Sequence, residues 1–281
     1  MATIIGGIGC SHAPAMAGVY DSGKTQQAPW APLFDAFART QSWLAALRPD
    51  LAIVVYNDHL NHFFFDNYPT FALGIADSYP LADEGRQKRD FASVPGDSAF
   101  GWHIADRLLA AEFDPSICQE LTVDHGVLAP LPLLLPYPWT VPILPLAVNV
   151  IRHPLPTPRR CYRLGQALRA AVESYPDARR VVVIATGGLS HHIHGPDFGY
   201  VNPAWDNDFL DALTETPDML TALTIQDIAE RAGAEGVEMI VWLTMRGALP
   251  PSVRCVERHY AAPALTGLAV LALEPTTATE G

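Results

Sequence analysis

The segment RVVVIATGGLSHH, residues 180–192, decides the fold more than any other stretch of the chain. It begins with a short continuous apolar run, turns at two glycines and then presents His191. Continuous apolar runs of this length are typical of strands buried on both faces of a sheet. A helical pattern precedes the segment, with Thr157 as a good N-cap and Pro158 suited to the first turn. Helix followed by buried strand is the pattern of an α/β sheet.

Four further runs have the same strand character, at residues 3–8, 51–56, 146–150 and 265–273. Pro142 and Pro145 enter the third of these runs, which predicts that its start is not a central strand. Helical patterns separate the runs, at residues 34–47, 98–111, 158–172, 206–213, 224–232 and 235–246. The alternation predicts one three-layer α/β domain over residues 1–275, followed by a frayed tail at 276–281.

Two segments are expected to be irregular. Residues 76–96 are polar and rich in turn formers, which predicts a long surface loop. Four prolines lie between positions 130 and 138, and we expect them to exclude a helix at 131–135.

Composition excludes several classes of protein. The formal net charge is −12 and no basic stripe is present, so nucleic-acid binding is not expected. An acidic surface also does not attract anionic aromatic acids at long range, so any binding of such substrates must be local. No apolar run approaches the roughly 20 residues that span a bilayer. The amino terminus lacks signal-peptide features, and the four cysteines form no Cys-x-x-Cys pair, which predicts a cytoplasmic protein with reduced thiols.

Histidines fall at the ends of three predicted strands. His12 follows the first strand, His59 follows Asn57-Asp58 after the second, and His191 follows the strand at 180–186. In open α/β sheets, ligands bind beyond the carboxyl ends of the strands. One such histidine is commonly structural, but three at equivalent strand ends favour a functional site.

A carboxylate partner is less obvious from the sequence. Glu238 interrupts the apolar helix at 236–243, where a buried acid must be paired or bind a metal. Glu235 could share its face, and periodicity alone leaves open that Glu238 faces solvent. His12, His59 and Glu238 together would form a facial triad, which suits non-haem Fe(II). The same donors also suit a zinc hydrolase. His191 fits an acid/base role because its ordinary pKa is near neutrality.

Many dispersed motifs occur together in one order along nearly the whole chain. They are SHAP (11–14), VYNDH (55–59), ADEG (82–85), VDHG (123–126), AAVES (170–174), TGGLSH (186–191), EGVE (235–238) and MRGALP (245–250). In these motifs the chain resembles the class III, LigB-type, extradiol dioxygenases, the family of the catalytic β subunit of protocatechuate 4,5-dioxygenase. The resemblance implies a three-layer α/β/α fold with a mixed central sheet.

The resemblance also implies residue roles. It implies His12, His59 and Glu238 as ligands of Fe(II), His191 as the acid/base residue and His125 beside the oxygen-binding side. It makes Asn57 a candidate contact to a substrate substituent. The implied reaction is ring cleavage of a catecholic substrate with O₂ to a muconate semialdehyde-type product. A small α-type subunit, a homologous protomer in a homo-oligomer or this chain's own loops would cover the site.

One departure concerns the substrate. Leu265 stands where protocatechuate-cleaving relatives have a serine that helps to hold the substrate carboxylate, and only Thr266, one position on, offers a hydroxyl. The departure argues against protocatechuate and leaves gallate, other substituted catechols, aminophenols and dihydroxypyridines open. The alternatives in other classes are the zinc hydrolase and a non-enzymatic protein of the same fold.

Overall fold

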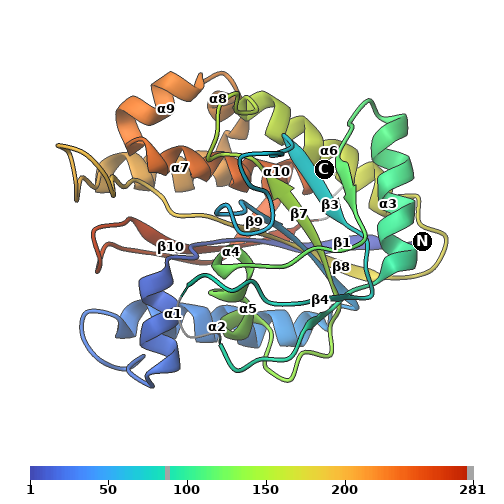
Figure 1. The fold of residues 1–281 in the computed structure, drawn as a ribbon, viewed down its shortest axis with the longest axis horizontal. Helices are drawn as coiled ribbons and strands as arrows, with labels where there is room; N and C mark the ends of the chain where they lie inside the picture. The colour runs from blue at the N-terminus through green and yellow to red at the C-terminus, as the bar shows by residue number, and fades with distance from the viewer. Residues whose placement is uncertain (86–88, 277–281) are drawn as a thin grey trace.

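A mixed eight-stranded sheet forms the centre of the molecule in the computed structural model, which describes residues 1–85 and 89–276 (Figure 1). The strand order is β6-β3-β7-β2-β8-β1-β10-β9. The strands are β1 (Thr3–Cys10), β2 (Leu51–Tyr56), β3 (Phe71–Gly74), β6 (Ser116–Cys118), β7 (Ile143–Val148), β8 (Arg180–Thr186), β9 (Val253–Ala261) and β10 (Leu268–Pro275). The four central strands β7, β2, β8 and β1 are parallel, while β10 and β9 pair antiparallel at one edge. The predicted mixed sheet is confirmed.

Helices cover both faces of this sheet, which confirms the three-layer α/β/α architecture (Figure 1). One face carries α1 (Pro14–Asp21), α2 (Ala31–Leu47), α4 (His125–Leu128) and α5 (Leu131–Leu134). The other carries α3 (Ser98–Ala110), α6 (Pro158–Glu173), α7 (Pro203–Glu215), α8 (Pro217–Thr221), α9 (Ile225–Ala232), the 3₁₀ helix η1 (Glu235–Ile240) and α10 (Val241–Ala248). Thr157 caps α6 as predicted, since its hydroxyl accepts from the Arg160 N–H at 3.2 Å.

Two separate apolar cores explain why the strands are apolar throughout. In β2, Ile53 and Val55 pack into the core beneath α6 and α10, while Val54 and Tyr56 pack into the core beneath α2 and α5. Successive side chains of a strand point to opposite faces, so a strand between two helix layers must be apolar at every position. All six residues of β2 are buried.

The prediction for the third strand is confirmed only at its start, where the residues before Leu146 have no ladder with β3. β7 is an interior strand, and it pairs with β2 from Ile143 onward, through Pro145. Its antiparallel ladder with β3 stops at Leu73 opposite Leu146, so no hydrogen bond to β3 is required of the position that Pro145 occupies. The proline ring lies beside Gly74, where a Cβ would come within 2.7 Å of it.

Two predictions of irregular structure are also wrong in part. Residues 131–134 form the short helix α5, because Pro130 stands at the N-cap position and Pro132 lies in the first turn, where a missing N–H costs nothing. Within the segment at 76–96, β4 (Ser78–Tyr79) pairs with β5 (Val94–Pro95). Tyr79 and Val94 are fully buried, so these ends of the segment belong to the core.

The described helices include none that is long and apolar enough to cross a membrane. The predicted tail at 276–281 lies, apart from Thr276, outside the described residues. The extent of a single domain over 1–275 stays a prediction.

Candidate functional site

The carboxyl ends of three adjacent parallel strands meet at one edge of the sheet. Cys10 of β1 is level with Thr186 of β8, and Val55 of β2 is level with Ala185. The loops that leave these ends therefore bring His12, His59 and His191 together, as the sequence predicted. One ring nitrogen from each of His12, His59 and His125 lies within 4.8 Å of the others.

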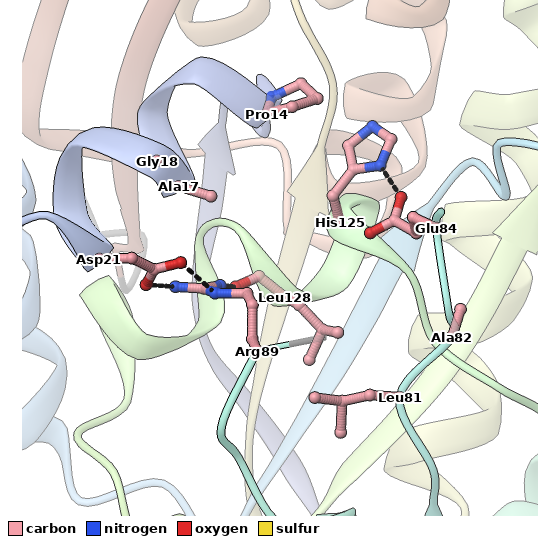
Figure 2. A pocket seen from close by; sticks show the side chains of 10 residues that line it. All are labelled: Pro14, Ala17, Gly18, Asp21, Leu81, Ala82, Glu84, Arg89, His125 and Leu128. Atoms are coloured by element: carbon pink, nitrogen blue, oxygen red, sulfur yellow. Dashed lines mark hydrogen bonds and ion pairs between the residues drawn. The ribbon is translucent and has the colours of Figure 1, made fainter. Parts of the chain in front are cut away.

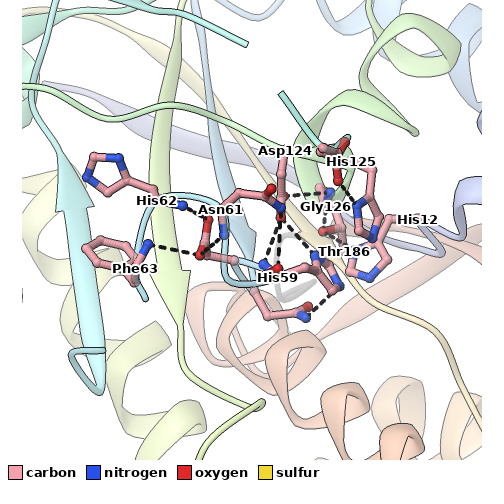
Figure 3. A network of polar contacts seen from close by, with 12 residues as sticks. His12, His59, Asn61, His62, Phe63, Asp124, His125, Gly126 and Thr186 are labelled. Carbon is pink, nitrogen blue, oxygen red and sulfur yellow. Dashed lines mark hydrogen bonds and ion pairs between the residues drawn. The ribbon is translucent and has the colours of Figure 1, made fainter. Parts of the chain in front are cut away.

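His12 is held with one ring nitrogen free. Its Nδ1 lies 3.0 Å from the hydroxyl oxygen of Thr186, and that hydroxyl donates to the carbonyl of Gly126 at 2.6 Å (Figure 3). The hydroxyl must therefore accept from His12 Nδ1–H, which leaves Nε2 of the neutral ring with its lone pair. Nε2 faces the carboxylate oxygen Oε2 of Glu238 at 3.2 Å. Two acceptors at this distance need a cation or a proton between them.

His59 is oriented by a buried carboxylate. Oδ2 of Asp124 accepts from Nδ1 of His59 at 3.0 Å and from its backbone N–H at 2.7 Å (Figure 3). Burial alone would lower the pKa of His59, but the charge and hydrogen bond of Asp124, together with the charges of Glu238 and Asp58, outweigh burial and raise that pKa. Burial likewise opposes ionisation of Asp124, but His59 and His125 hold its pKa below the usual range. Nε2 of His59 is the nitrogen that Asp124 leaves available, and it accepts from the amide of Asn57 at 2.9 Å, a contact that a bound metal would replace.

Glu238 projects from η1 and is only 6% exposed. Its Oε1 accepts from the Gly188 N–H and lies 3.7 Å from Nε2 of His191. Burial would raise the pKa of Glu238, but His12 and, more weakly, His191 and His59 lower it to about 2. A buried, ionised carboxylate facing the free nitrogen of His12 fits a divalent metal ion bound between them.

His191 is fixed by its own loop. Its Nδ1–H donates to the Leu189 carbonyl at 2.8 Å, so Nε2 is the nitrogen that carries the lone pair. The preceding Ser190 is held by Asp206, which accepts from its N–H at 2.8 Å and its hydroxyl at 2.7 Å. The imidazole is therefore fixed with its free Nε2 beside Glu238.

His125 stands between two cavities. Its ring stacks on that of His59, with centroids 3.8 Å apart and planes inclined by 28°, and its Nδ1 pairs with Glu84. On one side His125 lines a small cavity of about 280 Å³, where Arg89 pairs with Asp21 at 2.8 Å (Figure 2). On the other side it lines the main cavity.

The main cavity, of about 1040 Å³, contains the predicted metal-binding and acid/base residues. Its described lining includes His12, His59, His125, His191, Glu238 and Thr266, with a largely apolar wall of Val150, Ile151, Leu155, Ile193, Ile225, Ala229 and Val237. Thr266 thus faces the cavity, while Leu265 is 51% exposed and is not in the lining. Asn57 is fully buried behind His59, with its amide nitrogen 2.9 Å from Nε2 of that ring, so its contact with a substrate stays a prediction.

Sequence reasoning missed three residues that orient the site. Asp124 and Glu84 pair with His59 and His125, and Thr186 holds His12. Each lies inside a motif quoted above, but the motif does not say which distant histidine it contacts.

Comparison with known proteins identifies relatives of the chain. The family described as "Catalytic LigB subunit of aromatic ring-opening dioxygenase" matches residues 6–270. Gallate dioxygenase of Pseudomonas putida is 47% identical over 196 residues, which are 69% of this chain and 58% of that protein. The chain therefore spans little more than half the length of that relative.

Two further matches extend the comparison. The 2,3-dihydroxyphenylpropionate/2,3-dihydroxicinnamic acid 1,2-dioxygenase of Rhodococcus jostii is 25% identical over 258 residues, covering 76% of this chain and 80% of that protein. The crystal structure of an uncharacterized protein from Escherichia coli K12 superposes with a TM-score of 0.59 at 15% identity, covering 97% of this chain and 100% of the other, which supports the fold alone. Because the family match spans nearly the whole chain, this protein belongs to the LigB family of catalytic subunits of aromatic ring-opening dioxygenases.

Proposed function

We propose that this chain is an Fe(II)-dependent extradiol dioxygenase that opens the ring of a catechol with O₂ and yields a muconate semialdehyde-type product containing both oxygen atoms. One observation carries the proposal. A buried carboxylate, Glu238, faces the free Nε2 of His12 at 3.2 Å in a cavity that also holds His59 and a positioned base. Membership of the LigB family supports the same reaction class.

The metal ligands in this proposal are His12, His59 and Glu238. His12 and His59 each commit Nδ1–H to an acceptor, which directs the Nε2 lone pair toward a metal. The third ligand is assigned to Glu238 because a carboxylate reduces the charge of a buried divalent ion, which a third neutral imidazole does not. His125, whose Nδ1 pairs with Glu84, then stands beside the metal on the oxygen-binding side.

Iron bound by this facial triad would supply a redox-active centre with three open positions for the two catechol oxygens and O₂. The proton transfers and the exclusion of water are assigned to residues of the chain. Nε2 of His191 takes a proton from a catechol hydroxyl and returns it later in the reaction. His125, which lines the same cavity, is assigned to hydrogen-bond an oxygen atom of O₂, and the apolar wall is assigned to keep water from the ring.

The proposed substrate is a catechol with a carboxyl-bearing substituent, and gallate is the first candidate because of the relative that acts on it. Thr266 replaces the serine hydroxyl expected one position earlier, and it lines the cavity. Aminophenols and dihydroxypyridines present the same pair of metal-binding atoms and are the alternatives within this reaction class.

A cover over the cavity is part of the proposal. Several apolar side chains near its mouth are exposed, among them Ile151, Ile193 and Leu265. We propose that an α-type polypeptide or a second copy of the chain covers them in the cytoplasm.

A zinc hydrolase is the second candidate, because three histidines within 4.8 Å are also the donor set of a catalytic zinc site. In that case His125 would be a ligand and Glu238 a base.

One experiment separates the two candidates. The protein is purified anaerobically, loaded with Fe(II) and tested for O₂ uptake and product absorbance with protocatechuate, gallate, 3-O-methylgallate, catechol, 2-aminophenol and 3,4-dihydroxypyridine. Stoichiometric O₂ uptake with one compound, metal retained in His125→Ala and metal lost in Glu238→Ala, is the expected result. Zinc as the native metal, lost in His125→Ala, with no O₂ uptake would overturn the dioxygenase proposal.

A further inference from the structure

An anionic catechol meets an electrostatic obstacle in this protein. The chain has a formal net charge of −12, and the inner end of the cavity contains the ionised Glu238. Among the described residues that line the cavity, Arg152 is the one lysine or arginine. The positive charge needed for local binding of a carboxylate is therefore concentrated at a single position of this wall.

The backbone at Arg152 is held in a defined conformation. Arg152 follows β7, whose carboxyl end lies beside that of β2 at the edge of the sheet where His59 is found. The side-chain oxygen of Asn149 accepts from the N–H of Ile151 at 3.2 Å and from the N–H of Arg152 at 3.0 Å. The amide nitrogen of Asn149 donates to the carbonyl of Arg152 at 2.6 Å. The side chain of Asn149 thus binds both the N–H and the carbonyl of Arg152 and fixes the backbone of this loop.

The guanidinium of Arg152 is supported but carries no ionic partner. Its Cζ lies 4.7 Å from the centroid of the Phe65 ring, a cation–π contact that restricts the side chain. Within residues 1–85 and 89–276, no carboxylate forms an ion pair with it. Besides Glu238, the acid in the described cavity lining is Glu235. Its carboxylate pairs with His192 at 3.3 Å and with His194 at 3.0 Å instead of with Arg152.

We infer that Arg152 binds the carboxylate of the substrate, while the catechol oxygens occupy the inner end of the cavity beside His12, His59 and Glu238. This inference rests on the proposed ring cleavage and adds the recognition of an anionic substituent. A guanidinium presents two parallel N–H donors that match the two oxygens of a carboxylate. Arg152 would therefore determine the preference for acids over neutral catechols.

The test compares gallate with methyl gallate, which has the same ring hydroxyls but no negative charge. The iron-loaded protein and its Arg152→Gln and Arg152→Lys variants are titrated anaerobically with each compound by calorimetry, and kcat and KM are measured in air. We expect Arg152→Gln to weaken gallate binding about tenfold, since one charge-assisted contact at an exposed position is lost. Methyl gallate binding should change less than about twofold, and Arg152→Lys should recover part of the loss.

The control is Arg159→Gln, an exposed arginine of α6 outside the described lining, which should bind both compounds like the parent protein. Gallate binding in the parent should also weaken with added salt more than in Arg152→Gln. Equal effects of Arg152→Gln on gallate and methyl gallate, or none on either, would overturn the inference even if both are cleaved. Binding selective for gallate without O₂ uptake would instead refute the proposed reaction and leave the carboxylate site in place. No binding of gallate by the parent protein would overturn both.

Discussion

The inner and outer ends of the main cavity are built in different ways. At the inner end, His12 and Glu238 are almost completely buried, and each has a second atom fixed by a hydrogen bond to Thr186 or Gly188. At the outer end, Arg152 and Ile193 are exposed and extend from irregular loops. The inner end is a buried set of side chains on strand ends, while the outer end is an exposed rim built on loops.

This difference separates two kinds of function. Electrostatic and metal chemistry gains most where water is excluded and donors are fixed in advance. Selection among ring substituents needs only a few polar contacts on an otherwise apolar wall. Changes at the inner end should therefore affect every substrate alike, and changes at the rim should affect one class of substrate.

The largest effect is expected from Glu238→Gln. The amide keeps the shape of the side chain but removes the charge that a bound divalent metal requires, so we expect loss of stoichiometric metal and of ring cleavage for every catechol. Activity should fall by more than the roughly 10²–10⁴-fold that a single acid/base residue supplies. Metal content by mass spectrometry and O₂ uptake measure the two effects.

Glu235→Gln is the matched control for that variant. Glu235 lies on the same 3₁₀ helix and in the cavity lining, but it contacts His192 and His194 instead of the histidines of the inner end. We expect it to retain the metal. Equal metal loss in the two variants would show that the helix, and not the Glu238 charge, supports the site.

The next largest effect is expected from His191→Ala. Its Nε2 is the base in the proposed reaction, so kcat should fall about 10²–10⁴-fold for all substrates while the metal is retained. The exposed ring of His194 pairs with Glu235, so His194→Ala should leave kcat within about twofold of the parent value, as surface changes usually do. Steady-state rates and metal content in parallel test this assignment, which fails if His191→Ala binds no metal.

Asp124→Asn should have an intermediate effect through His59. Loss of the carboxylate that orients His59 should weaken metal binding about 10–100-fold, as measured by competition with a chelator. In the metal-free protein, the folded state lowers the pKa of Asp124 below its ordinary 3.8, so its contribution to stability is present above that pH and is lost as the pH falls below it. Urea unfolding at pH values above and well below 3.8 should therefore show a shallower acid loss in the variant.

Asp97→Asn is the control for this change, since Asp97 caps α3 as Asp124 caps α4. It removes the charge of a comparable cap outside the cavity lining, while the amide oxygen can still accept from the Phe100 N–H. The role of Asp124 would be refuted if both variants bound the metal equally well.

The sequence predicted the long elements because their signals are local. β2, β8 and α6 each bury a regular pattern of their own residues, and a cap or turn marks their ends. The sequence did not predict α5 or the small sheet of β4 and β5, because segments of two to four residues are too short to show a hydrophobic periodicity. Contacts with the rest of the chain decide whether such segments form a helix or a strand.

In the candidate site, too, features with a local signal could be predicted and long-range contacts could not. Histidines at strand ends could be placed beside each other because parallel strands share an edge. Their partners could not be placed, because Asp124 lies 65 residues from His59 and Thr186 lies 174 residues from His12. Pairing over such separations depends on how the loops pack above the sheet, which no pattern in one segment encodes.

The smallest effect is expected from Thr266→Val at the boundary between the two ends. Thr266 forms a β-bridge with His191 and is mostly buried, so the isosteric valine should preserve the loop while removing one hydroxyl. If that hydroxyl donates to one oxygen of the substrate substituent, kcat/KM for gallate should fall about fivefold, since one hydrogen bond is worth about 1 kcal/mol net. Methyl gallate retains a carbonyl acceptor and should lose about as much, in contrast to the selective loss expected in Arg152→Gln. A change in kcat for catechol, which has no substituent, would instead place Thr266 with the inner end through its contact with the His191 loop.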